Sequence, residues 1–191
     1  MNEKSRGYYK IEGAGCAFNF DFRDKVVLDI GSSTGGFTEY ALDRGAKKVI
    51  AIEKGSNQMK APLRFNPKVD LHEKTDIFDV EVGGEIIKET PDIIVADVSF
   101  VSLKKILEHA KHYLADRHTD FLVMMKPQFE AEDRQLNKGV VKNETMRREI
   151  IKDFEYYLRR NGFTIIKKRD NELTGKSGNR ERFYWLRKTN D

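Results

Sequence analysis

Short runs of strand-forming residues alternate with helical segments along nearly the whole chain, and this alternation restricts the fold more than any other feature. Two of the runs, IIVA at 93–96 and FLVMM at 121–125, are continuously apolar, as is typical of strands that are covered on both faces of a sheet. Helical periodicity is clearest at 101–114 and 144–160, and Asn143 is a suitable N-cap for the second of these helices. This order predicts an α/β fold with a doubly wound, mostly parallel sheet.

We expect one domain, because a chain of 191 residues leaves little room for a second one. Seven strands are expected, at residues 25–30, 48–53, 69–73, 92–97, 120–126, 163–168 and 183–187. The sheet is expected to end in a hairpin that contains its one antiparallel strand, with helices on both faces. Residues 1–24 form an N-terminal extension, helical at 10–18, and residues 25–191 form the domain proper.

The composition excludes several classes of protein. The longest apolar run is far shorter than the ~18 residues of a membrane span, and the N-terminus lacks the apolar core of a signal peptide. The single cysteine, Cys16, excludes an internal disulfide framework. His109 and His112 are three residues apart, but no third ligand stands at a matching spacing, so we expect no metal site. A soluble, cytoplasmic protein is expected.

Positive charge is concentrated in the last quarter of the chain. Residues 140–191 contain 14 basic and 8 acidic residues, whereas the net charge of the whole chain is +4. This excess favours a polyanionic partner, with nucleic acid as the first candidate. Solvated helix and strand faces would explain it about equally well.

A glycine-rich turn follows the first expected strand, in the segment VVLDIGSSTGGFT at 26–38. Glycines there let the backbone approach a ligand at the start of the next helix. A P-loop would need a lysine where this chain has Phe37, and a dinucleotide fingerprint would need a glycine at Ser33. S-adenosylmethionine fits the turn, since its pocket pairs an acidic residue before the first glycine with small loop residues. The expected contacts in this segment are Asp29, Gly31, Ser33, Thr34, Gly35, Gly36 and Phe37.

Further carboxylates lie at or just after the ends of expected strands. Glu53 is placed to accept hydrogen bonds from the ribose hydroxyls of the donor, and Asp76 from its adenine amino group. Asp97 follows the fourth strand and adjoins the same pocket. A single carboxylate is usually a surface or capping residue, but three at the right strand ends, namely Asp29, Glu53 and Asp76, favour a binding site.

Residues near the later expected strands indicate which chemical group accepts the methyl group. Cys16 lies before the first strand, which argues against a cysteine nucleophile for cytosine C5 methylation. The segment DVSF at 97–100 lacks the prolines that are typical of enzymes that methylate base amino groups. Lys126 ends an apolar strand, so its head is expected at the pocket floor, where it could take or orient a hydroxyl proton. Asp97 and Glu181 would then hold Lys126 and Lys10, unless the four form only a buried ion-pair network.

These residues carry a resemblance that spans nearly the whole chain. The matching stretches are SRGYYK at 5–10, LDIGSSTGGFT at 28–38, RGAKKV at 44–49, PDIIVADVSFVSL at 91–103, KPQFE at 126–130, KGVV at 138–141 and TGKSGNRE at 174–181. In them the chain resembles the TlyA-type, haemolysin-like branch of the FtsJ-like RNA 2′-O-methyltransferases. That family has a Lys-Asp-Lys-Glu tetrad, which falls here on Lys10, Asp97, Lys126 and Glu181.

The resemblance implies a class I methyltransferase fold and methyl transfer from S-adenosylmethionine to a ribose 2′-hydroxyl of ribosomal RNA, with Lys126 as the base or orienting group. The family usually has an S4-like RNA-binding domain before the methyltransferase, which we expect to be lacking here. RNA targeting would then depend on the basic last quarter or on a separate partner. The alternatives are a silent module that binds S-adenosylmethionine or RNA and, with less support, a membrane-active haemolysin.

Overall fold

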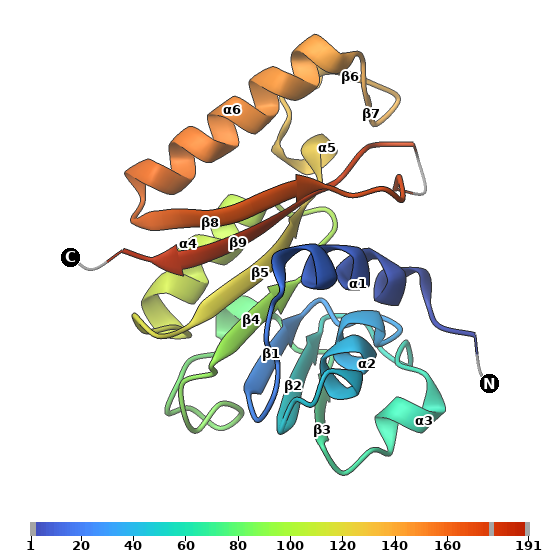
Figure 1. The fold of residues 1–191 in the computed structure, drawn as a ribbon, viewed down its shortest axis with the longest axis vertical. Coiled ribbons are helices and arrows are strands. Elements are labelled where there is room, and N and C mark those ends of the chain that lie inside the picture. The colour runs from blue at the N-terminus through green and yellow to red at the C-terminus, as the bar shows by residue number, and fades with distance from the viewer. Residues whose placement is uncertain (1–2, 176–177, 190–191) are drawn as a thin grey trace.

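Seven strands form one sheet in the order β3–β2–β1–β4–β5–β9–β8 (Figure 1). The computed structural model describes residues 3–175 and 178–189. The strands are β1 (Val26–Ile30), β2 (Lys48–Glu53), β3 (Val69–Glu73), β4 (Ile93–Ala96), β5 (Asp120–Met125), β8 (Phe163–Asp170) and β9 (Arg182–Lys188). The pairs from β3 to β5 are parallel, and β9 runs antiparallel to both of its neighbours. The expected mostly parallel sheet with one antiparallel strand is therefore confirmed.

Helices cover both faces of the sheet. They are α1 (Arg6–Phe18), α2 (Gly36–Asp43), α3 (Ala61–Arg64), α4 (Leu103–Tyr113), α5 (Pro127–Glu130) and α6 (Glu144–Arg160), with short 3₁₀ turns η1 (Ile77–Asp79) and η2 (Asp133–Gln135). The apolar residues of α1 and α2 share one core cluster with alternate strand residues, and those of α4 and α6 share another with the remaining ones. This division follows from the two-residue period of a strand, which sends successive side chains to opposite faces.

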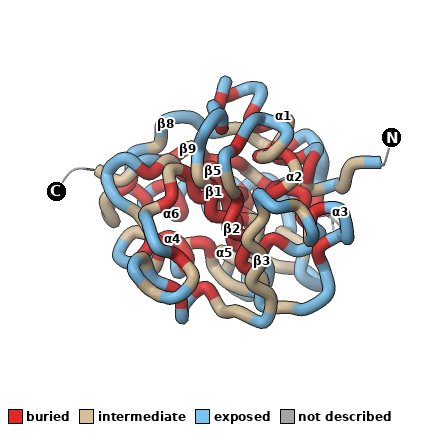
Figure 2. Tube along the Cα trace, turned by 90° about the horizontal axis from the view of Figure 1, so that it is seen from below, coloured by how far each residue is buried: buried red, intermediate tan, exposed pale blue. Residues whose placement is uncertain are grey.

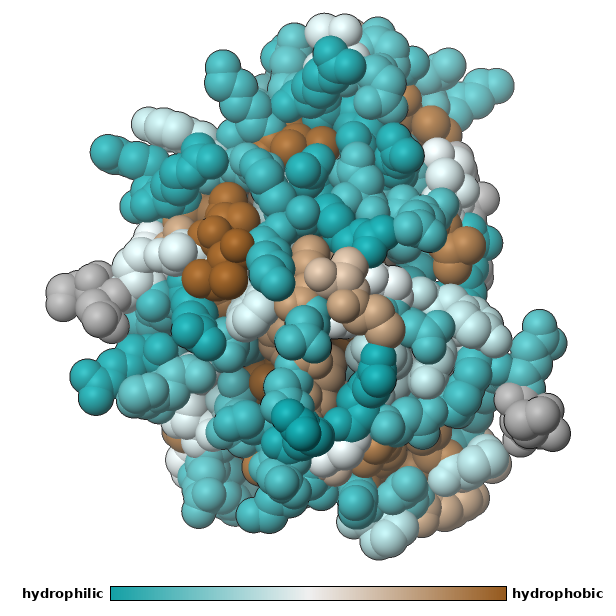
Figure 3. Space-filling model, in the orientation of Figure 1, coloured by the Kyte–Doolittle hydropathy of each residue, from teal (hydrophilic) through white to brown (hydrophobic). Residues whose placement is uncertain are grey.

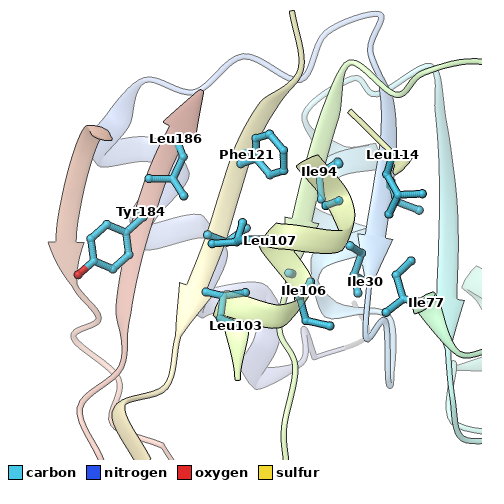
Figure 4. Close-up of a cluster of buried hydrophobic side chains, with 14 of the residues drawn as sticks. Ile30, Ile77, Ile94, Leu103, Ile106, Leu107, Leu114, Phe121, Tyr184 and Leu186 are labelled. Carbon is cyan, nitrogen blue, oxygen red and sulfur yellow. The ribbon is translucent and has the colours of Figure 1, made fainter. Parts of the chain in front are cut away.

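The larger core lies between the sheet and the helices α4 and α6. Figure 4 shows the apolar side of α4 against strand residues, with Leu103, Ile106 and Leu107 lower in the view than Ile94 and Phe121. Figure 2 shows that most residues of the central strands are buried. Such continuous burial requires apolar side chains on both faces of each strand, which explains the unbroken runs in β4 and β5.

The N-terminal segment packs into the second core. α1 begins four residues before the expected start, because Ser5 caps it by accepting a hydrogen bond from the Tyr8 amide at 3.2 Å. Ile11 and Phe18 of this helix are buried in the second core, together with apolar residues of the strands. α1 lies so close to α2 that a Cβ at Gly36 would stand 2.7 Å from the Tyr8 nitrogen.

Two long segments differ in structure, one between β5 and α6 and the other between β8 and β9. The first contains α5, η2 and a small hairpin of β6 (Leu136–Asn137) and β7 (Val140–Val141). The second, residues 171–180, includes Lys176 and Ser177, which lie outside the described residues. In the part of the chain that is described, no helix has the length and apolarity needed to cross a membrane.

Candidate active site

Two adjoining cavities open at the carboxyl ends of the parallel strands, where ligands bind in open α/β sheets. The first cavity has a volume of about 740 Å³ and the second about 590 Å³. They share part of their lining, namely Gly31, Ser33, Asp97, Ser99, Phe100 and Lys126. Two ligands that occupied the two cavities would therefore meet at this common wall.

The glycine turn brings the ends of β1 and β4 together. Gly31 has φ +77°, and a Cβ added there would stand 3.0 Å from the carbonyl oxygen of Asp97. Its amide donates to the carbonyl of Ile52 at 2.9 Å. Only glycine meets both the backbone conformation and the close approach, so no side chain from position 31 enters the first cavity.

Carboxylates at the ends of β2 and β3 line the first cavity. Glu53 accepts hydrogen bonds from the amides of Ser33 at 2.8 Å and Gly55 at 2.6 Å, which hold its side chain at the rim. Asp76 accepts a hydrogen bond from the Lys54 ammonium at 2.8 Å, and that contact lowers the pKa of the carboxyl group. Both groups are acceptors that face a cavity large enough for a nucleoside.

The four tetrad positions line the second cavity together. The Lys126 Nζ lies 2.5 Å from Asp97 Oδ1, and the Lys10 Nζ lies 2.6 Å from Glu181 Oε2. The side chains of Lys10, Lys126 and Glu181 are only 10%, 11% and 3% exposed. Neither ion pair has the angular geometry of a hydrogen bond, so each is chiefly a contact between charges. Lys126 also donates a hydrogen bond to the Ser99 hydroxyl at 2.8 Å.

Strand direction explains how residues so far apart in sequence meet. Asp97 and Lys126 directly follow β4 and β5, and Pro127 ends the extended segment. Glu181 precedes β9, but because β9 is antiparallel its first residue, Arg182, pairs with Met125 at the end of β5. The residue before an antiparallel strand thus lies at the same edge as the residues after the parallel ones. Lys10 reaches this edge from α1.

The remaining expected donor contacts divide into two groups. Thr34, Gly36 and Phe37 line the second cavity. Asp29 and Gly35 are not among the residues that line either cavity, and their contact with the donor stays a prediction. A Cβ at Gly35 would meet the Leu63 side chain, so its role is close packing against α3.

Asp29 lies behind the glycine turn. It is fully buried and accepts a hydrogen bond from the Thr38 hydroxyl at 2.6 Å, which fixes the first turn of α2. Burial raises the pKa of this carboxyl group to about 7. Its second oxygen has no partner among the described residues.

Several lining residues were not predicted. Lys54 and Gln58 lie beside Glu53 at the first cavity, and Ser99 and Phe100 lie in the shared wall. The position of Ser99 two residues after the tetrad aspartate was a usable signal. Phe100 is 93% exposed with φ +66°, a conformation that is uncommon for a bulky residue and that nothing in the sequence pattern indicates.

Comparison with known proteins identifies relatives over the full length of the chain. The family model of FtsJ-like methyltransferases matches residues 4–188. A protein of Mycobacterium tuberculosis named 16S/23S rRNA (cytidine-2′-O)-methyltransferase TlyA is 37% identical over 191 residues, which cover 98% of this chain and 69% of that protein.

Solved structures share the fold. A putative hemolysin from Streptococcus thermophilus has a TM-score of 0.93 and 32% identity, over 100% of this chain and 69% of that one. A putative S-adenosylmethionine-dependent methyltransferase from Listeria monocytogenes has a TM-score of 0.65 at 19% identity, over 95% of this chain and 100% of that one. The second likeness concerns the fold alone, which is that of class I methyltransferases.

Proposed function

The chain belongs to the FtsJ-like methyltransferase family, and from this premise we propose that it transfers a methyl group from S-adenosylmethionine to a ribose 2′-hydroxyl of ribosomal RNA. The observation that carries the proposal is the second cavity, in which Lys10, Asp97, Lys126 and Glu181 come together beside the wall shared with the first. The relatives at 35–37% identity named for rRNA methylation support RNA as the substrate. This substrate would place the reaction in the cytoplasm.

The first cavity fits the donor. Glu53 offers carboxylate oxygens to ribose hydroxyls, and Asp76 offers one to an adenine amino group. Gly31 leaves the space that a longer side chain would fill. S-adenosylmethionine, when bound, supplies a methyl group on a positively charged sulfur. The anionic Asp97 in the shared wall favours a positive charge at that point.

The second cavity is suited to positioning and proton transfer. We assign Lys126 as the group that takes or orients the proton of the 2′-hydroxyl. Asp97 and Ser99 hold its nitrogen from two sides, which restricts it to one orientation. Lys10 and Glu181 form the opposite ion pair and bind the acceptor ribose. Most of the rate would come from holding the reacting atoms in place.

The experiment is transfer of labelled methyl groups from S-adenosylmethionine to unmodified ribosomal subunits and to naked rRNA, followed by mass spectrometry of the nucleosides. A 2′-O-methylated nucleoside that is lost with Lys126→Ala is the expected result. Donor binding without label in either substrate would contradict the proposal and favour a binding module on a methyltransferase fold.

A further inference from the structure

A groove with a volume of about 420 Å³ lies between α6 and β8, outside both cavities. Basic side chains from α6, from β8 and from the loop before β9 line it: Arg147, Arg148, Lys152, Arg159, Lys168 and Arg180. The surface over α6, at the top of Figure 3, is mainly hydrophilic. The groove is therefore a polar, positively charged depression on the outer layer of the fold.

The carboxylates in the groove are already neutralised. Asp170 accepts hydrogen bonds from Arg147 at 2.7 Å and from Arg182 at 3.0 Å. Glu155 accepts one from Lys168 at 2.7 Å. Glu144 lies 3.9 Å from Arg147. These pairs fix the walls and leave a net positive charge facing the solvent.

Two cations remain available for a ligand. Arg148 and Lys152 are exposed, stand four residues apart on α6, and form no ion pair within residues 3–175 and 178–189. Because residues four apart lie on the same side of a helix, both side chains can reach one ligand.

Charge is segregated around α6. Glu149 and Asp153 directly follow Arg148 and Lys152 in the sequence, so they lie on a different side of α6. On that side their negative charges interact with the positive charge of Arg134. Glu149 and Asp153 thus face η2, whereas the only acidic residues of α6 that line the groove beside its basic ones are the paired Glu144 and Glu155. On a helix that is merely solvated, charges of both signs typically alternate along one face. The separation of the unpaired basic residues from Glu149 and Asp153 therefore favours an anionic ligand.

The groove begins next to the second cavity. Arg180 and Arg182 line it, and the residue between them is Glu181, which lines the second cavity instead. Arg147 donates a hydrogen bond to the Arg180 carbonyl at 3.2 Å, which ties α6 to this loop. From there to Arg159, α6 advances by roughly 18 Å at 1.5 Å per residue. The segment 180–182 thus borders both hollows, and a polymer that passes over it could contact the second cavity and the groove.

We propose that this groove binds the phosphate backbone of the RNA substrate, beside the nucleotide whose ribose occupies the second cavity. The inference rests on the proposed function, since that function makes RNA the substrate. Guanidinium groups bind phosphates with two parallel hydrogen bonds. Such contacts fix the register of the nucleic acid without reading its sequence.

The test is the double charge reversal Arg148→Glu/Lys152→Glu. We would measure filter binding of naked 16S and 23S rRNA between roughly 50 and 200 mM salt. The logarithm of the affinity falls linearly with the logarithm of the salt concentration. For a single strand, each phosphate that the variant no longer neutralises makes this fall shallower by about 0.7, so the magnitude of the slope should decrease by about 1.4. If the double variant does not fold, Arg148→Gln/Lys152→Gln provides the same test with a smaller change of charge.

The matched control is Lys47→Glu/Lys68→Glu, which changes the net charge equally. Both lysines are exposed and precede β2 and β3, at the edge of the sheet opposite the cavities. An equal decrease of the slope in both double variants, or in neither, would overturn the proposal. The methyl-transfer assay on the unaltered chain is independent of this result: RNA that binds through the groove but is never methylated would count against the proposed function alone.

Discussion

At the scale of single residues, Lys126 combines a nearly buried head with two fixed neighbours, Asp97 and Ser99. We expect Lys126→Ala to lower methyl transfer by at least about 10²-fold, the range of a missing proton acceptor. Affinity for S-adenosylmethionine should stay nearly unchanged, because the carboxylates for the donor belong to β2 and β3. Turnover assays and calorimetric titration of the donor measure the two quantities. Loss of donor binding would contradict the role given to Lys126.

Ser99→Ala tests a positioning residue at the same nitrogen. Removal of the hydroxyl leaves Lys126 held by Asp97 alone, so we expect kcat to fall and the pH dependence of kcat to shift, with KM for the donor unchanged. Ser99→Thr keeps a hydroxyl and should restore most of the rate. A loss of stability without any change in the pH profile would show that Ser99 has only a structural role.

Asp29 predicts a pH dependence of stability. Its pKa is about 7 in the folded chain against roughly 3.9 in an unfolded one, so between these values the folded state holds a proton that the unfolded state has released. The free energy of unfolding therefore falls as pH rises from about 4 to about 7, by up to roughly 4 kcal/mol from this group. Asp29→Asn should remove this component. Urea unfolding of both proteins at a series of pH values measures it, and parallel pH profiles would contradict it.

At the scale of elements, the contact of α1 with α2 decides whether Lys10 reaches the site. A methyl group at Gly36 would meet the Ser5 hydroxyl and the Tyr8 amide. Gly36→Ala should therefore push α1 outward, lower the free energy of unfolding by about 1–3 kcal/mol, and reduce methyl transfer. Chemical denaturation and turnover assays measure the two effects.

Gly13→Ala is the matched control for that substitution. Gly13 lies inside α1, is exposed, and an added Cβ has no atom within 4 Å. Alanine in a helix interior is better than glycine by roughly 0.5–1 kcal/mol, so this variant should be more stable and fully active. Equal losses in both variants would show that the contact of α1 with α2 does not explain the result, because helix propensity predicts a gain for each.

Elements with a clear period could be predicted from the sequence, and short ones could not. The bounds of β2, β3 and α6 coincide with those expected, because each ends at an abrupt change of pattern. The four-residue α5 and the two-residue strands β6 and β7 lie between the strand expected at 120–126 and the helix expected at 144–160, and they were not predicted because no period can be recognised over so few residues. At the site, the tetrad lysines and carboxylates could be located because three of them adjoin strand ends. The position of Asp29 could not, because its place inside β1 sends its side chain toward α2, away from the cavities.

At the scale of the whole molecule, binding of the donor should stabilise the folded chain, because the donor contacts several strands of the sheet. The first cavity is lined by residues that follow β1, β2, β3 and β4, so a ligand there joins four strands and binds the folded chain only. At about 100 times its Kd it should raise the free energy of unfolding by roughly 2.7 kcal/mol. Gly31→Val should abolish this gain, because the side chain would stand against Asp97 in a backbone conformation that valine rarely adopts. Thermal unfolding with and without S-adenosylmethionine measures the gain, and an undiminished shift in the variant would place the donor elsewhere.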